Sequence, residues 1–301
     1  MRVMDRKTTK AGLDAESPEM PVVPGFAHRF VHIPGLRAHV ATSGEGEPVL
    51  MLHGLPQHWW QWRRVGPALG ERYRVICPDA RGFGWSEAAS PRIARYSMRD
   101  DVLALLDALE LERVRLVAHD MGAVVAAQLA YAHPERVRAM VVLSVPPPFM
   151  RLGLGMLPAM RHVPKLRYRR AGSSLDWVFA PPYVATPMSE QTRQTYLRPL
   201  RDPAKDAAIS EVYRGLLIGG EMPALAAGAY RRRRLAVPAL YCFGEKDEPL
   251  TAPFVRKQVG DVSRFADHVE FAAIADAAHF ATDDNPDGVV EPMREFFARA
   301  A

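Results

Sequence analysis

Residues 112 to 131 constrain the fold more than any other part of the chain. Within them, Val-Arg-Leu-Val at positions 114 to 117 is typical of a short strand that is buried on both faces of a sheet. From Met121 onward the residues are rich in Ala, Val and Leu at helical spacing, and neither glycine nor proline interrupts them between Gly122 and Pro134. We therefore predict a strand, a sharp turn and a helix, which is the repeating unit of a parallel α/β sheet.

The turn between that strand and that helix centres on Asp120. Ala118 and Gly122 lie two residues before and two residues after it. Such small neighbours let a strand and a helix approach closely, as in a nucleophile elbow, which presents one side chain at the carboxyl end of the sheet. A carboxylate in this position can attack a strained ring, or an sp³ carbon with a leaving group, and form an alkyl ester. The alternative is an ordinary turn aspartate that caps the helix.

Strands and helices alternate on both sides of this unit. Apolar and polar residues alternate before and after Pro34-Gly35, which predicts an antiparallel hairpin. The other predicted elements are strands at 47–52, 74–78, 137–145, 237–243 and 268–274, and helices at 59–69, 97–109, 253–259 and 286–298. This pattern predicts an α/β protein with a mostly parallel, eight-stranded sheet and helices on both faces.

The alternation stops at Pro146-Pro147-Pro148 and resumes near residue 235. The residues between them carry arginine, proline, aromatic residues and helical stretches at about 188–200 and 204–219, but no buried strand. Residues before the hairpin are polar and contain prolines, without the apolar core of a secretory signal. The predicted organisation is a flexible lead-in at 1–24, an α/β core domain at 25–147 and 235–301, and an inserted helical cap (lid) at 148–234.

Two loops after the predicted cap supply further polar residues. Asp247 and His279 each come just after a predicted strand, and the carboxyl ends of parallel strands share the edge of the sheet where α/β proteins place their chemistry. The chain order nucleophile, acid, histidine is that of the α/β-hydrolase fold. We therefore predict a catalytic triad of Asp120, Asp247 and His279. Glu245 and Glu248 are alternatives to Asp247, and a turn aspartate with an unrelated loop histidine is the alternative to the pair.

Motifs and composition argue against several other classes. The chain has no Gly-x-Ser-x-Gly sequence, which argues against an ordinary serine esterase, lipase or peptidase. It also lacks zinc-type, Walker and dinucleotide-binding motifs, so we expect no metal and no cofactor. No apolar run approaches the ~20 residues of a membrane span. The net charge is +5, but the Arg231–Arg234 cluster is more typical of a solvated segment than of a nucleic-acid site.

The two cysteines indicate the cellular compartment. Cys77 and Cys242 lie within apolar, strand-like runs, which is typical of reduced core residues. With 48% hydrophobic and 24% charged residues, the chain has the composition of an ordinary soluble globular protein. We therefore predict a cytoplasmic protein without disulfides.

Three motifs lie in the predicted sheet-end loops: His53-Gly54-Leu55-Pro56 with its tryptophan-rich continuation to Arg63, Asp-Ala-Arg-Gly-Phe-Gly-Trp-Ser at 79–86, and His-Asp-Met-Gly-Ala at 119–123. They resemble the His-Gly-x-Pro segment, the Asp-x-Arg-Gly-x-Gly-x-Ser loop and the His-Asp-Trp-Gly-Ala elbow of epoxide hydrolases in the α/β-hydrolase superfamily. The resemblance runs from about residue 26 to the end and is weakest in the cap. It implies an α/β-hydrolase fold, and hydrolysis of an epoxide to a vicinal diol through a covalent ester on Asp120.

The resemblance also implies the surroundings of the reaction. The backbone N–H groups of Leu55 and Met121 would form an oxyanion hole for the tetrahedral intermediate. A cis peptide before Pro56 would turn the Leu55 N–H group inward. The residues expected to contact the substrate are His53, Pro56, Trp59 and Phe280.

Opening an epoxide also requires a hydrogen-bond donor for the ring oxygen, which two cap tyrosines supply in this family. A phenol with a pKa of about 10 is a neutral donor at pH 7. Tyr213, in Glu211-Val212-Tyr213-Arg214, resembles the Tyr-Arg pair late in the family's cap. For the first tyrosine we predict Tyr168, with Tyr183 as the alternative.

Met121 departs from the family, which usually has tryptophan at this position. The expected oxyanion donor is a backbone N–H group, so catalysis should survive the change, while the pocket wall loses an indole. In haloalkane dehalogenases that tryptophan N–H binds the halide, and methionine has no donor to replace it. The substitution therefore disfavours haloalkane chemistry.

We predict a cytoplasmic, cofactor-independent epoxide hydrolase with a role in detoxification. Its partners would be a small-molecule epoxide and water, without nucleic acid, and the oligomeric state is open between a monomer and a homodimer. Two alternatives remain: a haloacid or haloalkane dehalogenase, and a non-catalytic ligand-binding protein of the same fold. The sequence predicts neither the epoxide nor the regiochemistry and enantioselectivity.

Overall fold

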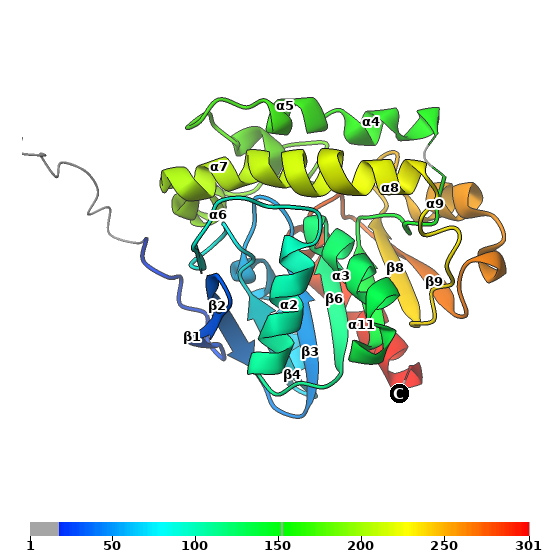
Figure 1. Cartoon of the computed structure of the whole chain (residues 1–301), viewed down its shortest axis with the longest axis horizontal. Coiled ribbons are helices and arrows are strands. Elements are labelled where there is room, and N and C mark those ends of the chain that lie inside the picture. Colours follow the sequence, from blue (N-terminus) through cyan, green and yellow to red (C-terminus); the bar gives the residue numbers. More distant parts are fainter. Residues whose placement is uncertain (1–17, 152, 301) are drawn as a thin grey trace, which may run out of the picture.

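A mixed, mostly parallel sheet forms the centre of the protein (Figure 1). The computed structural model describes residues 18–151 and 153–300. In sheet order the strands are β1 (Ala27–Ile33), β2 (Leu36–Ser43), β4 (Tyr73–Pro78), β3 (Glu47–Leu52), β6 (Val114–His119), β7 (Val137–Leu143), β8 (Ala239–Gly244) and β9 (Val269–Ile274). This path contains the eight predicted strands, and a ninth of two residues, β5 (Glu87–Ala88), pairs with β2.

The hairpin at the edge of the sheet follows the predicted alternation. β1 and β2 pair antiparallel, with Ile33 opposite Leu36 across the turn. β2 also pairs antiparallel with β4, whereas the pairs from β4 through to β9 are parallel. The carboxyl ends of β3, β4, β6, β7, β8 and β9 therefore meet at one edge.

Each central strand contributes to a core on both faces of the sheet. In β3, Val49 and Met51 pack on one side, and Leu50 and Leu52 on the other, as the two-residue period of a strand requires. One core contains residues of η1 (Trp59–Trp62), α1 (Val65–Gly70) and α11 (Pro286–Arg299). The other contains residues of α2 (Ser97–Ala108), α3 (Met121–Ala132) and α9 (Ala252–Val259). The predicted layers, with helices on both faces, are confirmed.

The helices between β7 and β8 lie above the carboxyl-end edge of the sheet (Figure 1). The main helices are α4 (Leu157–Met160), α5 (Val163–Arg167), α6 (Glu190–Leu197), α7 (Pro203–Glu211), the π-helix η6 (Val212–Glu221) and α8 (Met222–Ala226). Shorter 3₁₀ turns are η3 (Leu154–Met156), η4 (Asp176–Phe179) and η5 (Arg198–Arg201). The described residues of this segment contain no strand. The predicted helical insertion is therefore present, while the domain boundaries stay a prediction and the lead-in before residue 18 lies outside the described residues.

Buried polar contacts join these upper helices to the layers below. Tyr196 of α6 accepts a hydrogen bond from Arg63 at 2.8 Å and donates to Asp283 at 3.0 Å. At the end of η6, the Glu221 carboxylate accepts from Gln128 of α3 at 2.9 Å and from Arg95 at 3.1 Å. These bonds fix the upper helices over the sheet edge.

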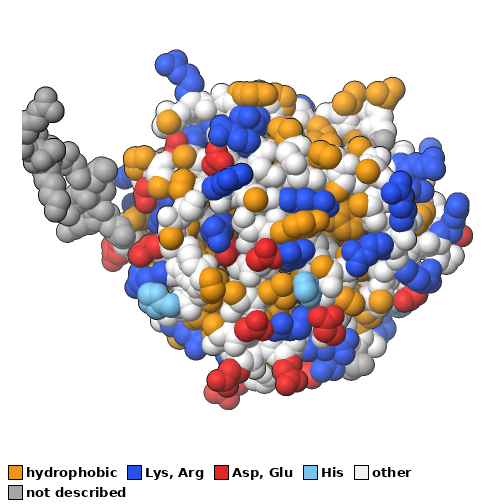
Figure 2. Space-filling model, viewed as in Figure 1, with side chains coloured by type: hydrophobic (Ala, Val, Ile, Leu, Met, Phe, Trp, Pro, Cys, Tyr) orange, Lys and Arg blue, Asp and Glu red, His pale blue; other side chains and the backbone are white. Residues whose placement is uncertain are grey.

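Three of the four residues in the Arg231–Arg234 run are exposed and Arg231 is half-buried, as expected for a solvated segment, and three of the side chains also bind neighbouring groups. Arg231 donates to the Phe149 carbonyl at 2.7 Å, and Arg233 donates to the Tyr131 carbonyl. Arg234 pairs with Asp267. On the face drawn in Figure 2, Lys and Arg side chains are interspersed with acidic and apolar ones. The run is therefore solvated as predicted, while its contacts with the Phe149 and Tyr131 carbonyls and with Asp267 could not be predicted because these partners are far away in the sequence.

Both cysteines are free and buried in the core, as their apolar neighbours predict. No helix within residues 18–151 and 153–300 combines the length and the apolar character needed to cross a membrane.

Asp79 organises the loop that follows β4. Its Oδ1 accepts from the Trp59 N–H at 2.7 Å, and its Oδ2 accepts from the Trp85 N–H at 2.8 Å and lies 2.7 Å from the His39 ring. The carboxylate is 1% exposed. Burial alone would raise the pKa of Asp79, but His39 and further histidines, His58 among them, outweigh it and hold this pKa below its ordinary value.

Asp79→Ala is expected to lower the free energy of unfolding by about 3 kcal/mol, because two backbone N–H groups and a buried imidazole lose their acceptor. Chemical denaturation at pH 7 measures the loss. Asp107→Ala is the control, since Asp107 forms a largely exposed pair with Arg136 and its removal should stay within about 0.5 kcal/mol of wild type. Similar losses in both variants would contradict the role of Asp79.

Because its pKa is lowered on folding, the contribution of Asp79 to the free energy of unfolding is present above its unfolded pKa of about 4 and is lost as the pH falls.

Candidate functional site

Asp120 lies at the predicted sharp turn between β6 and α3. Its backbone has φ 48° and ψ −117°, a strained conformation for a residue other than glycine, and its side chain makes no capping hydrogen bond to α3. The close approach depends on Gly122, where a Cβ atom would come within 2.4 Å of the Leu52 carbonyl oxygen. The alternative interpretation as a helix cap is therefore wrong, and the carboxylate is directed to other partners.

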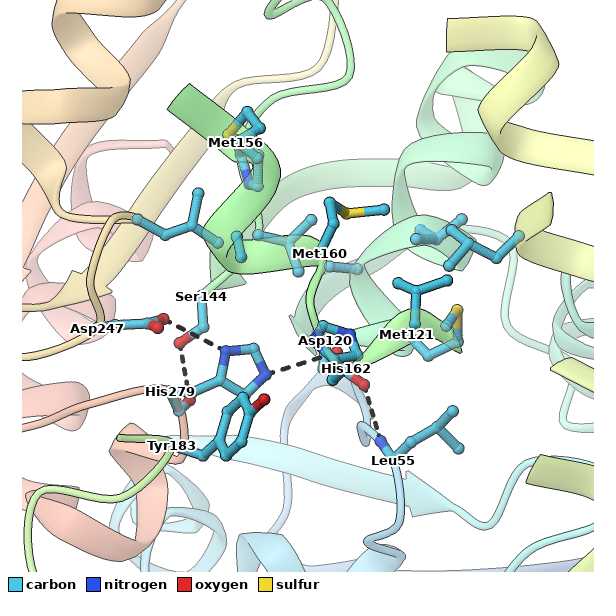
Figure 3. A pocket seen from close by; sticks show the side chains of 18 of the residues that line it. Leu55, Asp120, Met121, Ser144, Met156, Met160, His162, Tyr183, Asp247 and His279 are labelled. Carbon is cyan, nitrogen blue, oxygen red and sulfur yellow. Dashed lines mark hydrogen bonds and ion pairs between the residues drawn. The ribbon is translucent and has the colours of Figure 1, made fainter. Parts of the chain in front are cut away.

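Those partners hold the carboxylate on two sides (Figure 3). The Leu55 N–H donates to Asp120 Oδ1 at 2.9 Å, and Asp120 Oδ2 lies 3.5 Å from His279 Nε2. Burial would raise the pKa of Asp120, but His279, His119 and the Leu55 N–H outweigh it and lower this pKa below its ordinary value. The carboxylate is therefore ionised at neutral pH, as a nucleophile has to be.

His279 lies in the loop between β9 and α10 (Ala281–Asp284). Its Nδ1 is 3.3 Å from Asp247 Oδ2, while its carbonyl oxygen accepts from Ser144 Oγ at 2.8 Å and lies 2.9 Å from His119 Nε2. Burial opposes a charge on the imidazole, but the carboxylates of Asp247 and Asp120 outweigh it and raise the pKa of His279 to about 10. The ring is thus held between two acids and carries a proton while both are ionised.

Asp247 is buried at the turn that follows β8, where it faces His279. Its two alternatives, Glu245 and Glu248, are exposed. The structure therefore brings together Asp120, His279 and Asp247 from three different sheet-end loops.

The loop after β3 has the expected cis peptide between Leu55 and Pro56. This loop turns the Leu55 N–H toward Asp120, and Met121 follows the carboxylate as the first residue of α3. The resemblance implies that both N–H groups are oxyanion donors. In the structure, the Leu55 N–H donates to the Asp120 carboxylate.

Only one of the four predicted substrate contacts, Phe280, lines the main cavity. His53 is buried beneath it, where its Nε2 accepts from the Ala80 N–H at 2.9 Å. Trp59 is fully buried and packs on Phe26 and His28. Pro56 is buried too and lies outside the cavity wall. For Pro56 and Trp59 the prediction was wrong, because both side chains are buried in the packing that holds these loops in place, whereas His53 lines a second, smaller cavity.

The two predicted cap tyrosines have different positions. Tyr213, in η6, is 3% exposed and lines the cavity, where burial and the nearby Asp120 raise the pKa of its phenol. Tyr168 is 75% exposed at the end of α5, with the Arg167 guanidinium 4.7 Å from the centre of its ring. Tyr168 as the first tyrosine was therefore wrong. Its alternative, Tyr183, lines the cavity, and its carbonyl accepts from the Phe280 N–H at 3.1 Å.

The sequence prediction missed His162, a half-buried residue between α4 and α5 that also lines the cavity. Its ring centre lies 6.1 Å from that of Tyr183 and 6.0 Å from that of Tyr213. Burial lowers the pKa of His162, so the ring is neutral at pH 7. No spacing pattern marks a histidine in this arginine- and proline-rich stretch, so the sequence carried no signal for it.

These side chains border a cavity of about 210 Å³ between the sheet edge and the upper helices. Its polar residues include Asp120, Tyr183, Tyr213 and His279, whereas much of its wall consists of aliphatic and methionine side chains. The methionines are Met121, Met150, Met156, Met160 and Met222. Such a cavity suits a mainly apolar small molecule that carries one reactive polar group. Among the described residues, no three His, Cys, Asp or Glu side chains come together as a metal site requires.

The chain is similar in sequence and structure to several known proteins. Residues 47–286 match the family model for the alpha/beta hydrolase fold. The chain is 28% identical to a soluble epoxide hydrolase of Corynebacterium sp. (strain C12) over 91% of its own length and 98% of the relative's. It resembles the structure of a putative epoxide hydrolase from Pseudomonas aeruginosa with a TM-score of 0.75 at 30% identity, covering 94% of this chain and 98% of that one. A shorter match, 36% identical over 42% of this chain and 43% of the relative, is to a fluoroacetate dehalogenase of Burkholderia sp..

Proposed function

This chain belongs to the α/β-hydrolase fold family, and we propose that it is an epoxide hydrolase that forms a vicinal diol through a covalent ester on Asp120. One observation carries the proposal. An ionised carboxylate at a strained elbow borders the same cavity as the phenols of Tyr183 and Tyr213, with a histidine–aspartate pair at its side. This is the set of groups needed to open a strained ether ring and then hydrolyse the resulting ester.

In the first step, Asp120 attacks one ring carbon while the bond from that carbon to the ring oxygen breaks. Tyr183 and Tyr213 donate hydrogen bonds to the oxygen, which leaves as an alkoxide and takes up a proton from a phenol or from water. The raised pKa of Tyr213 keeps its phenol protonated at neutral pH, so it is a donor that does not neutralise Asp120. The product is an ester between Asp120 and a hydroxyalkyl group.

In the second step, His279 removes a proton from a water molecule, which attacks the ester carbonyl. The oxygen that already accepts from Leu55 becomes the oxyanion, and the Met121 N–H is its second donor. Asp247 orients the imidazole and stabilises its positive charge. The bond between the acyl carbon and the alkyl oxygen then breaks, and that oxygen takes up the proton of the newly added hydroxyl group. The diol leaves, the Asp120 carboxylate is restored, and His279 keeps the proton it took from water.

The charges around His279 explain why it can act as a base in the second step although it is protonated in the free enzyme. In the free enzyme the carboxylates of Asp120 and Asp247 raise the pKa of His279 to about 10. Ester formation removes the charge of Asp120, so the pKa of His279 must then fall. After the intermediate has formed, the imidazole therefore gives its proton to solvent and only then can act as a base.

This change predicts different pH dependences for the two steps. Alkylation should vary less than about 3-fold between pH 6 and 9, since Asp120 stays ionised, whereas ester hydrolysis should rise with pH through the lowered pKa of His279 and then level off. Single-turnover measurements separate the two rates. In Asp247→Asn the rise should begin at lower pH, because a second negative charge is lost, and the plateau should be lower. An ester-hydrolysis rate that does not change with pH would contradict the base role of His279.

The proposal also includes the cellular compartment, the cofactor requirement, the partners and the role of the protein. We place it in the cytoplasm because its two cysteines are free and buried. It acts without a cofactor, since the side chains of the cavity supply every group that the two steps use. Its partners are a small-molecule epoxide and water, and its role is the detoxification of reactive epoxides.

The second candidate is a dehalogenase, which the shorter match to the fluoroacetate dehalogenase favours. Such an enzyme uses the same carboxylate but needs a donor that binds halide, and Met121 has none on its side chain. The cavity offers two phenols, whose hydroxyl groups suit an alkoxide, but Arg161, His162 and Trp177 also line it and carry N–H groups that can bind halide. The test is to incubate the protein with terminal epoxides and with haloalkanes or haloacids, and to measure diol and halide release in parallel. Diol formation that is lost in Asp120→Ala supports the proposal, and halide release without diol formation contradicts it. Tight binding of epoxides without turnover would favour the third alternative, a non-catalytic ligand-binding protein.

A further inference from the structure

A second, smaller cavity lies behind the wall of the main one. It has a volume of about 50 Å³ and is lined by β1, β2, the loop after β4, α2 and α3. Leu55 and Met121 line both cavities, so these two side chains separate them. In the view of Figure 3 they stand on the side of Asp120 that faces away from His279.

The smaller cavity is suited to hydrocarbon rather than to water. Most of its lining is aliphatic, and its polar side chains already have partners. Arg81 and Asp101 form a two-bond pair at 2.5 Å, His53 accepts from the Ala80 N–H, and Asp79 accepts from the Trp59 and Trp85 N–H groups and pairs with His39. A bound water needs two to four polar partners, and this wall leaves it few.

The volume and the lining of the smaller cavity indicate which chemical group it can hold. A cavity of about 150 Å³ by a comparable measure takes up benzene, so about 50 Å³ suits a group of one or two carbons. Methionine is unbranched and adapts its shape readily, so a movement of the Met121 side chain that joined the two cavities by a passage would cost little. The wall is next to the nucleophile, because Leu55 binds its Oδ1 and Met121 is its chain neighbour.

We propose that the smaller cavity is a subsite for a methyl or ethyl substituent on the epoxide ring, and that Met121 gives access to it. The substrate class is then a 2,3-disubstituted epoxide with one short and one longer apolar group. The longer group occupies the main cavity of about 210 Å³, with its methionine-rich wall. This inference rests on the proposed function, since it requires an epoxide at Asp120.

Two neighbouring valines of α3 allow a matched test. Val125 lines only the smaller cavity, whereas Val124 lines only the main one. The substrates are 1,2-epoxyoctane and cis-2,3-epoxynonane, which differ by one methyl group on the ring. The measured quantity is the ratio of kcat/KM for the disubstituted epoxide to kcat/KM for the terminal one.

Val125→Phe should lower this ratio by about 10-fold or more, because the methyl group loses its space. Val124→Phe should change both values together and leave the ratio within about 3-fold. Met121→Trp, which closes the passage from the other side, should lower the ratio as Val125→Phe does and serves if that variant does not fold, as judged by thermal denaturation.

A ratio that neither Val125→Phe nor Met121→Trp lowers, or a wild-type protein that hydrolyses only 1,2-epoxyoctane, would overturn the subsite while leaving the proposed function intact. Failure of the wild-type protein to hydrolyse either epoxide would instead refute the proposed function.

Discussion

His279→Gln is expected to stop after one chemical step and to accumulate a stable ester on Asp120. The glutamine can keep the loop in place but cannot remove a proton from water, so turnover should fall by at least about 10⁴-fold. After incubation with an epoxide, intact-protein mass spectrometry should show an adduct with the mass of the epoxide. Digestion should place it on the peptide that contains Asp120.

Two variants control for this result. Asp120→Ala combined with His279→Gln should form no adduct, because the nucleophile is missing. His162→Gln changes the other histidine of the cavity in the same way, and it should not accumulate the ester, since among the described residues it is His279, and not His162, that pairs with Asp247. A folded His279→Gln protein that forms no adduct, or one that still turns over at the wild-type rate, would contradict the two-step scheme.

The double variant Tyr183→Phe/Tyr213→Phe should lose most of the alkylation rate. Each phenol donates one hydrogen bond to the oxygen that leaves, and a positioned donor of this kind contributes about 10²-fold or more. We expect about 10²-fold for each single variant and about 10⁴-fold for the double variant. Rapid-quench measurement of ester formation tests this, while hydrolysis of a preformed ester should change much less.

Tyr168→Phe is the matched control, because Tyr168 is exposed and away from the cavity. Its rates should equal those of the wild type. If Tyr168→Phe and Tyr213→Phe slowed the reaction equally, or if the double variant alkylated at the normal rate, the phenols would not be the donors. Their role would then have to be assigned to another donor of the cavity, such as His162 or Trp177, whose rings lie 6.1 Å and 5.8 Å from that of Tyr183.

Local pattern was enough to predict the sheet and the elbow. The buried run before Asp120, the small residues around it and the uninterrupted helix after it depend on neighbours in sequence, and the structure has each of them. Asp247 and His279 could be placed at the same edge because every parallel strand ends there. The cis peptide at Pro56 came from the resemblance alone, not from spacing.

The cap could not be predicted in the same detail, because its helices are short and their orientation depends on packing. Tyr168 ends a helix of five residues, α5, whose contacts are with α7 and η6 far along the chain. No periodicity in its own sequence shows which side faces the cavity. Tyr183 and His162 lie in loops and depend on the same contacts. The prediction that Trp59 contacts the substrate was wrong for a related reason. A motif residue can contribute to a site by packing in the core and holding a loop in place, without lining the cavity itself.

The central claim is that Asp120 forms a bond to the substrate, and a single turnover in H₂¹⁸O tests it most directly. With enzyme in excess over epoxide, the diol formed in the first turnover should contain no ¹⁸O, because its new oxygen comes from the Asp120 carboxylate. One ¹⁸O atom should instead appear in the peptide that contains Asp120, since the water oxygen enters the carboxylate when the ester is hydrolysed. Label in the first-turnover diol and none in that peptide would show that water attacks the epoxide directly, and would contradict the account.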